Sequence, residues 1–350
     1  MDLISRMTNK ETNLLVMSLE TYLDRVVEAM LAKDPEDVTL RSNVGILNWA
    51  TSTIFGTYVK EARALASRCN LEEQADMETS IALIHEIHSK RKQGIHFRKL
   101  DDGKHIFEPR TSRKEGIADV SDPHRSRAVG DGDVIVTKLD IEVADDHYNI
   151  YEDDPLLKKD FDEEKIPTTP MFKVSTYSDA SYAPRGEDGR SDIMFIVFVN
   201  GAPVDWNPIT LKGVADSAST AEYCGASVGC KKGGAVLILL RFAGIALDDH
   251  DQCIDSTSGK QIAENPKKLG STRNLGIRWH LIRYAIHALN LKLKYCITED
   301  CVPDFGTKRL ARKKLERFAI IFFNCLHLDW RGNWDDLLYI CGAGVFPEWD

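Results

Sequence analysis

The chain lacks several features that mark common classes of protein. No apolar run approaches the roughly 18 residues that a membrane-spanning helix needs. The first fifteen residues carry four charged side chains in place of the apolar core of a signal peptide. None of the eight cysteines belongs to a C-x-x-C pair, which argues against a zinc knuckle or ribbon. No glycine-rich phosphate-binding loop occurs. We therefore expect an intracellular protein with reduced thiols and no membrane segment.

The charge balance of the chain is acidic. Its 350 residues include 54 acidic and 45 basic side chains, so the formal net charge is −9. A protein that binds nucleic acid usually has a basic surface. Binding of nucleic acid by this chain would therefore depend on a local basic groove, which the net charge does not exclude. The length suggests about two domains.

The first hundred residues have the periodicity of helices. Apolar positions recur at helical spacing over residues 11–33, 44–68 and 72–91. Residues 1–99 are therefore predicted to form a small all-helical region.

Residues 100–170 differ in composition from both flanking regions. They are polar and then strongly acidic, with one predicted strand at 133–143. This composition indicates an acidic insertion or linker, and we expect residues 104–168 to pack poorly. Tyr151-Glu152-Asp153-Asp154 imitates the Tyr-x-Asp-Asp motif of polymerases. It lies in the acidic run instead of a hairpin between apolar strands, so a solvated loop is the better interpretation.

From residue 171 the pattern becomes that of an α/β domain, predicted to end at residue 323 and to precede a tail, 324–350. The Asn200-Gly201 pair between apolar runs predicts a β-hairpin. Predicted strands cover residues 172–179, 193–199, 204–206, 252–255 and 292–298, and predicted helices cover 219–246, 272–289 and 308–323. This order predicts a mixed five-stranded sheet with helices.

Four acidic residues fall at the ends of these predicted elements: Asp179, Glu222, Asp255 and Asp304. Hydrolysis of a phosphodiester by two divalent cations needs several carboxylates that converge on one spot, and Mg²⁺ prefers oxygen ligands. The alternative is structural. The chain has 54 acids, and an isolated aspartate at a strand end is usually a turn residue or a helix cap.

Longer segments make the interpretation more specific. TYSDASYA, GAPVDW, SASTAEY, CIDSTSG, STRNLGIRWHLIR and KLKYCITEDCVPDFGTKRL occur in this order. Together they resemble the ribonuclease H domain of copia-type LTR retrotransposon Pol polyproteins. LRSNVGILNWATSTIF and SIALIHEIHSKRKQGIHF are similar to the reverse transcriptase thumb or connection segment that precedes it. The resemblance covers most of the chain, except residues 104–168 and the last twenty-odd residues, and it implies a ribonuclease H-like fold.

The resemblance implies a function as well. Asp179, Glu222, Asp255 and Asp304 match the four metal-binding acids of the family. They imply an endonuclease that cuts the RNA strand of an RNA–DNA hybrid with two Mg²⁺ ions, which Mn²⁺ can replace. Asp179 would bridge the ions, Glu222 and Asp255 would complete one of them, and Asp304 would help to hold the other. The remainder of a reverse transcriptase is the implied protein partner, and a cytoplasmic retroelement particle or the nucleus the implied location.

Candidate contacts to nucleic acid follow from the same matched segments: Ser256, Thr257, Ser258, Arg278, His280 and Lys308. Ser256 and Thr257 stand where the family has Asn-Gln, and a hydroxyl reaches a 2′-hydroxyl over a shorter distance than an amide does. Further departures are Thr220 in place of an acid, and Asn274 and Gly276 in place of His and Asp.

A second hypothesis is a catalytically inactive interaction or structural protein derived from a retroelement. The absence of a polymerase palm, the negative charge and the acidic insertion favour it. The four retained acids favour the nuclease, because clustered carboxylates repel one another and destabilise a fold that has no cation to bind.

Overall fold

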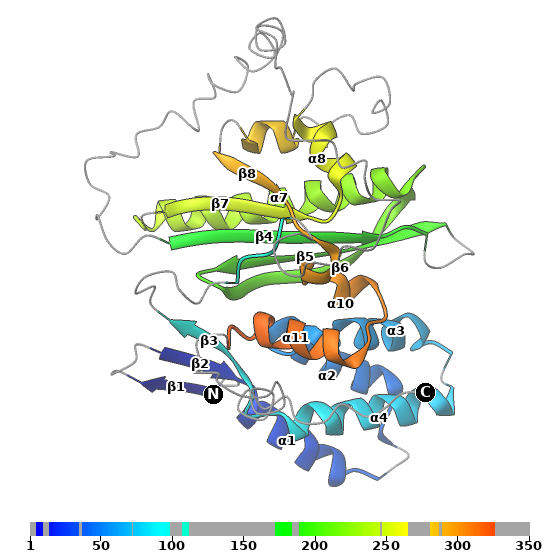
Figure 1. Cartoon of the computed structure of the whole chain (residues 1–350). Coiled ribbons are helices and arrows are strands. Elements are labelled where there is room, and N and C mark those ends of the chain that lie inside the picture. Colours follow the sequence, from blue (N-terminus) through cyan, green and yellow to red (C-terminus); the bar gives the residue numbers. More distant parts are fainter. Residues whose placement is uncertain are drawn as a thin grey trace, which may run out of the picture.

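The computed structural model of the protein describes residues 5–9, 14–34, 37–71, 73–98, 107–111, 172–183, 189–245, 247–264, 281–286 and 289–325. A five-stranded sheet lies between helix α7 on one side and helix α11 with the N-terminal region on the other (Figure 1). No helix in the described ranges is long and apolar enough to span a membrane. The seven cysteines in these ranges are all free thiols.

The N-terminal region is mainly helical, as predicted. Its helices are α1 (Glu20–Leu31), α2 (Leu40–Thr53), α3 (Val59–Arg68) and α4 (Gln74–Ser89), with a short 3-10 helix, η2 (Gly56–Tyr58), before α3. Each helix buries one apolar side against its neighbours, as Leu23 and Leu47 illustrate.

The expectation that this region is all-helical is wrong at its edges. β1 (Ser5–Asn9), β2 (Leu14–Ser18) and β3 (Gly94–Arg98) form an antiparallel sheet with β2 in the centre. The short apolar run of β2 fits a strand and a helix equally well. Its pairing with β3, about 80 residues away, decides between them, and periodicity cannot reveal such a partner.

The C-terminal sheet confirms the predicted mixed five-stranded arrangement. Its strands are β4 (Phe172–Ser181), β5 (Arg190–Val199), β6 (Ala202–Val214), β7 (Leu247–Ile254) and β8 (Leu291–Tyr295), in the order β6-β5-β4-β7-β8. β4, β5 and β6 are antiparallel, whereas β7 and β8 run parallel to β4. Asn200 and Gly201 both have positive φ, at 51° and 81°, as the two-residue turn requires.

The helices of this part are α7 (Ala218–Phe242), α8 (Thr257–Glu264), α10 (Asp304–Thr307) and α11 (Arg312–Phe322). Helix α8 was not predicted, and the single helix expected over 308–323 is wrong at its start, because Lys308 to Ala311 separate α10 from α11. Of the helix expected over 272–289, residues 281–286 are helical and most others lie outside the described residues. The expected strand 133–143 and Tyr151–Asp154 lie outside them too.

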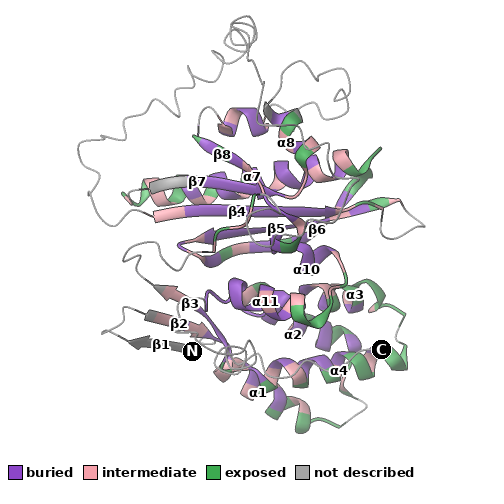
Figure 2. Ribbon diagram, viewed as in Figure 1, coloured by how far each residue is buried: buried purple, intermediate pink, exposed green. Residues whose placement is uncertain are grey.

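Strand alternation divides the apolar side chains between two cores, one on each face of the sheet. In Figure 2 the central strands β4 and β5 are mostly purple, the colour of buried residues. On β5, Phe195 and Val197 belong to the core beneath α7. Their neighbours Ile196 and Phe198 belong to the core shared with α11 and the N-terminal helices. Each fully buried side chain of this size contributes roughly 1.5–3 kcal/mol to the stability of the folded state.

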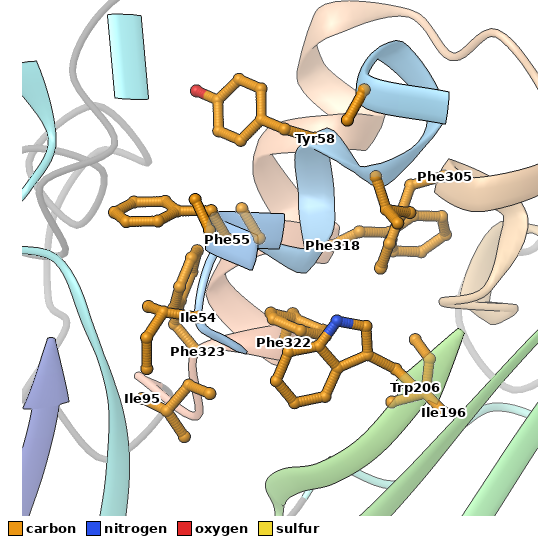
Figure 3. Packing of buried hydrophobic residues seen from close by; sticks show 14 of the residues in the cluster. Ile54, Phe55, Tyr58, Ile95, Ile196, Trp206, Phe305, Phe318, Phe322 and Phe323 are labelled. Atoms are coloured by element: carbon orange, nitrogen blue, oxygen red, sulfur yellow. The ribbon is translucent and has the colours of Figure 1, made fainter. Parts of the chain in front are cut away.

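The second core joins the N-terminal region to the sheet (Figure 3). The Trp206 indole of β6 packs edge-on against Phe322 of α11, with ring centroids 5.1 Å apart, and its Nε1 donates a hydrogen bond to the Thr51 carbonyl at 2.9 Å. A Cβ at Gly56 would overlap the Phe322 ring. The close approach at Gly56 therefore fixes η2 and the start of α3 against the sheet.

The described part of the acidic insertion, residues 107–111, is half-buried or exposed and makes specific contacts with the α/β part of the chain. Phe107 lies against Tyr177, with ring centroids 6.2 Å apart. Arg110 makes a two-point contact with Asp300, with both N–O distances at 2.9 Å, and its carbonyl accepts a hydrogen bond from the Ile297 amide. The rest of the insertion lies outside the described residues, so the prediction of poor packing there stays a prediction.

Candidate metal centre

Parallel pairing brings the first two candidate acids to one edge of the sheet. Ser178 of β4 is paired with Ile254 of β7. Asp179 follows Ser178 within β4 and Asp255 follows the last residue of β7, so the two aspartates reach the same edge side by side. Asp179 is completely buried, and Asp255 is partly exposed. The ends of neighbouring parallel strands are a common place for polar side chains to form a site.

Helix α10 brings the third acid to the same edge. It packs on β5 at Gly306, where a Cβ would lie 2.7 Å from the Met194 side chain. Asp304 at its first position is completely buried. Ligand atoms of Asp179, Asp255, Asp304 and the Cys301 thiol all lie within 4.8 Å of one another, a spacing that suits a metal ion.

Glu222 is more peripheral than the three aspartates. It lies in the second turn of α7, which begins after Ser217, whose hydroxyl accepts a hydrogen bond from the Thr220 amide at 3.2 Å. Glu222 is not in the group of atoms within 4.8 Å, but the charges of Asp179 and Asp255 reach it. Burial, with the charges of these two aspartates, raises the pKa of Glu222 to about 9.

Close contact between α7 and the sheet allows this position of Glu222. A Cβ at Gly233 would overlap the Thr176 side chain of β4, and one at Gly229 would lie 3.0 Å from Gln252 Nε2 of β7. Glycine at these positions lets the helix backbone approach the strands that carry Asp179 and Asp255.

The aspartates are held in an environment that disfavours their charged forms. Burial, followed by the charge of Asp304, raises the pKa of Asp179 to about 7, although Lys308 opposes the shift. Thr307 donates a hydrogen bond to Asp179 Oδ2. Burial also raises the pKa of Asp255, whose Oδ2 accepts a hydrogen bond from Thr298 Oγ1 at 3.3 Å. Groups with pKa values shifted by burial and by like charges are common at functional sites.

Two lysine side chains provide positive charge within this centre. Lys308 Nζ lies 2.9 Å from Asp179 Oδ1, 2.8 Å from Asp304 Oδ1 and 3.9 Å from Asp255 Oδ2. Lys314 Nζ lies 2.6 Å from the other oxygen of Asp304. Lys308 was expected to contact nucleic acid, but in this structure its ammonium group is a counter-ion for the three aspartates.

The other expected contacts to nucleic acid are placed in part. Ser256 and Ser258 are 3.1 Å apart at their hydroxyls, Ser258 is 3.0 Å from the Ser219 hydroxyl, and Thr257 begins α8. These residues form a hydroxyl cluster immediately after Asp255. Arg278 and His280 lie outside the described residues.

Sequence reasoning did not assign Cys301 or Thr307 to this centre. Cys301 was assigned only to the reduced thiols, because an isolated cysteine gives no signal of a ligand role. Thr307 was read only as part of a motif, although its hydroxyl binds Asp179. Both contacts depend on the turn between β8 and α10, which has no periodicity to predict it.

The strand order and the acids at one sheet edge define a ribonuclease H-like domain preceded by a helical region. The chain is 28% identical over 149 residues to the "Retrovirus-related Pol polyprotein from transposon RE1" of Arabidopsis thaliana, which is 42% of this chain and 10% of that protein. The RE2 protein of the same plant is 28% identical over 150 residues, and the TNT 1-94 protein of Nicotiana tabacum is 27% identical over 143 residues. The chain thus has partial similarity to copia-type retrotransposon Pol polyproteins and spans about a tenth of their length.

No family model matches the chain. Among solved structures, the N-terminal RNase H domain of a Mycobacterium tuberculosis protein is 14% identical, with a TM-score of 0.26, over 42% of this chain and 96% of that one. LC11-RNase H1 in complex with an RNA/DNA hybrid is 11% identical, with a TM-score of 0.25, over 37% of this chain and 88% of that one.

Proposed function

We propose that this chain is a metal-dependent endonuclease of the ribonuclease H type, which hydrolyses the RNA strand of an RNA–DNA hybrid. The observation that carries the proposal is the convergence of Asp179, Asp255 and Asp304 from three separate elements on one sheet edge. A fold has no structural need to gather buried like charges, because each raises the cost of ionising the others. The partial similarity to retrotransposon Pol polyproteins supports the same conclusion.

The donor set fits Mg²⁺ or Mn²⁺. Carboxylate oxygens of three aspartates lie within 4.8 Å of one another, and hard divalent cations take such oxygen ligands. Asp179, Asp255 and Asp304 would hold the ions, with Glu222 completing the set. Bound ions would supply an activated water and stabilise the leaving oxygen.

The surrounding residues of the chain keep the acids in position. Thr307 and Thr298 donate hydrogen bonds to Asp179 and Asp255, which fixes one oxygen of each carboxylate. Lys308 and Lys314 neutralise part of the negative charge and hold Asp304 through both of its oxygens. The site is therefore preorganised, a condition for catalysis by positioned charges.

The hydroxyl cluster next to Asp255 suits the RNA strand. Ser256, Ser258 and Ser219 each offer a donor and an acceptor within one small area. Proteins distinguish RNA from DNA by contacts to the 2′-hydroxyl. Thr257 and Lys308, with Arg278 and His280, remain proposed contacts to the substrate.

Cleavage of a labelled RNA–DNA hybrid in Mg²⁺ tests this function. We expect the unmodified chain to cut the RNA strand only, and the Asp179→Asn variant to be inactive. Asp205→Asn is a matched control, because Asp205 pairs with the half-buried Lys232 at 3.1 Å, away from the centre. An unmodified chain that leaves the hybrid intact while folded would refute the proposal.

The second candidate function is a catalytically inactive interaction or structural protein. The observation in its favour is that Lys308 and Lys314 form ion pairs with Asp179 and Asp304. The two functions differ in their response to Mg²⁺. A nuclease gains thermal stability from the ion by mass action, whereas an ion-paired relic does not.

A further inference from the structure

We infer that the N-terminal region takes part in substrate binding: Lys60 of α3 and Arg309, just after α10, form a cationic ridge that binds the phosphates of the uncut DNA strand. This inference rests on the proposed function. It places the DNA strand on the side of the acids opposite the hydroxyl cluster.

The position of α3 follows from its contacts with the sheet. Arg63 donates a hydrogen bond to Thr210 of β6, and its Nη2 lies 3.5 Å from Asp192 Oδ1 of β5. Asp192 is paired with Ser181, two residues beyond Asp179. Helix α3 also packs against α10, the helix that carries Asp304. These contacts hold the first turns of α3 at the same sheet edge as the acids (Figure 1).

Lys60 lies one turn before Arg63 on α3, and Arg309 follows α10, against which α3 packs. Both cations are therefore near the sheet edge that carries the acids. Burial lowers the pKa of Lys60, the adjacent Glu61 raises it, Arg309 lowers it, and the charges of Asp192 and Asp179 raise it. Within the described part of the chain, neither side chain is assigned a hydrogen bond or an ion pair. Arg309 is exposed and Lys60 is half-buried, so both can meet a ligand.

The strand order separates the ridge from the hydroxyl cluster. Along this edge the order is β6, β5, β4 and β7. The contacts of α3 lie on β6 and β5, the central acid lies on β4, and the hydroxyl cluster follows β7. Three strand spacings separate the two sides by roughly 14 Å. One duplex can therefore place one backbone on each side of the acids.

The chemistry of the two sides differs in a way that suits the two strands. The β7 side offers hydroxyl groups, which can recognise 2′-hydroxyls of RNA. The α3 side offers cations, which bind any phosphate and need no 2′-hydroxyl. The chain has a net charge of −9, so a local pair of unpaired cations beside the acids has a clear role in attracting a polyanion.

Binding of a short RNA–DNA hybrid, measured by fluorescence anisotropy at several salt concentrations, tests the ridge. All proteins carry Asp179→Asn so that the hybrid stays intact. We expect Lys60→Ala and Arg309→Ala each to weaken binding several-fold and to reduce the slope of log K against log salt by about 1. Lys33→Ala is the matched control, because Lys33 is an exposed lysine that follows α1 at the far end of the N-terminal region.

Hybrids with neutral methylphosphonate linkages in one strand test the strand assignment. Neutral linkages in the DNA strand should weaken hybrid binding by the Asp179→Asn protein. The same linkages should leave the hybrid affinity unchanged when Lys60→Ala and Arg309→Ala are added to that protein as a double variant. Neutral linkages in the RNA strand should weaken both proteins equally. The reverse pattern would overturn the assignment to the DNA strand.

Cleavage assays separate failure of the ridge from failure of the proposed function. On the native background, the double variant should raise KM and leave kcat unchanged. One outcome is that the unmodified chain cuts the hybrid but the double variant binds it as tightly as the protein without these two changes. The proposed role of Lys60 and Arg309 would then be wrong, and the proposed nuclease function would be retained. If the unmodified chain neither binds nor cuts the hybrid, both are wrong. Arg309 is exposed, so its variant should fold even if the Lys60 variant is destabilised.

Discussion

Asp300 and Asp179 are both almost completely buried, yet their surroundings have opposite effects on their charge. Asp300 accepts hydrogen bonds from the Arg110 amide at 2.8 Å and from the Arg110 and Arg317 guanidinium groups. Burial alone would raise its pKa, but these hydrogen bonds outweigh burial and lower the pKa of Asp300 to about 2. Asp179 faces two other aspartates, and burial with the charge of Asp304 raises its pKa to about 7.

The difference shows how this fold separates structural acids from acids suited to binding an ion. Arginine forks saturate the oxygens of Asp300 and join the insertion to α11, so that carboxylate has no capacity left for a ligand. Around Asp179 the compensation comes from Lys308, a flexible point charge shared among three acids. A divalent cation would compensate the charge of the three aspartates more fully than Lys308 does. The oxygens of Asp300 are already occupied by the arginine hydrogen bonds.

The largest effect should come from neutralising an acid of the metal centre. Asp255→Asn should reduce Mg²⁺-dependent hybrid cleavage to the background rate, because an amide keeps the shape of the side chain but removes charge that the cations need. Without Mg²⁺ the variant should be at least as stable as the unmodified chain, since repulsion with Asp304 is relieved. Cleavage rates and thermal melts measure the two effects. Retention of normal cleavage would remove Asp255 from the site.

The corresponding change at Asp300 should act on stability instead. Asp300→Asn removes the buried anion that the partly exposed Arg110 and Arg317 share, and it should cost about 2 kcal/mol of the free energy of unfolding. Urea denaturation measures this loss, and kcat of the folded variant should be nearly normal. Glu20→Gln is the control, because its exposed pair with Lys92, at 3.8 Å, should contribute less than about 0.5 kcal/mol. Equal losses of unfolding free energy in Asp300→Asn and Glu20→Gln would contradict a structural role for Asp300.

The two acids should also respond to pH in opposite directions. The folded pKa of Asp300 is depressed, so its contribution to stability is present above its ordinary pKa of 3.8 and is lost as pH falls towards 2. The pKa of Asp179 is raised, so its contribution is present at low pH and is lost as pH rises through about 7. Glu222 extends that loss towards pH 9.

Metal-free protein should therefore be most stable near pH 4, and its free energy of unfolding should fall by about 1.4 kcal/mol per unit of pKa shift as pH rises from 4 towards 9. Urea denaturation in EDTA at pH 5, 7 and 9 measures the decline. Mg²⁺ should remove most of this decline in stability with pH, and Asp179→Asn should make the decline smaller. A metal-free stability that rises from pH 5 to 9 would contradict the raised pKa values.

The smallest effect should come from removing the internal counter-ion. Lys308→Met should lower stability by about 1 kcal/mol in EDTA, because three aspartates lose a cation that is partly exposed to solvent. The loss should shrink in Mg²⁺, and the increase of Tm caused by Mg²⁺ should be larger than in the unmodified chain. Lys313→Met, a change of an exposed residue nearby, is the control. Equal losses with and without Mg²⁺ would show that Lys308 acts independently of ion binding.

Much of the C-terminal sheet could be predicted from the sequence, for local reasons. The Asn200-Gly201 pair fixes the β5–β6 hairpin because both residues tolerate positive φ. A continuous run of apolar residues, 193–199, marks β5, and a long segment without proline marks α7. The candidate acids were found because each falls at the end of such an element and within a motif with a known resemblance.

The sequence by itself determined where most strands and helices lie and which acids follow them, since these depend on short-range periodicity and turn chemistry. Tertiary structure alone decided three other features. Residues 14–18 form a strand because β3 pairs with them. Lys308 contacts the acids because α10 packs on β5 at Gly306. Lys60 reaches the same edge because Arg63 and the core around Trp206 fix α3 there. Each depends on residues distant in the chain, whose contacts no local pattern records.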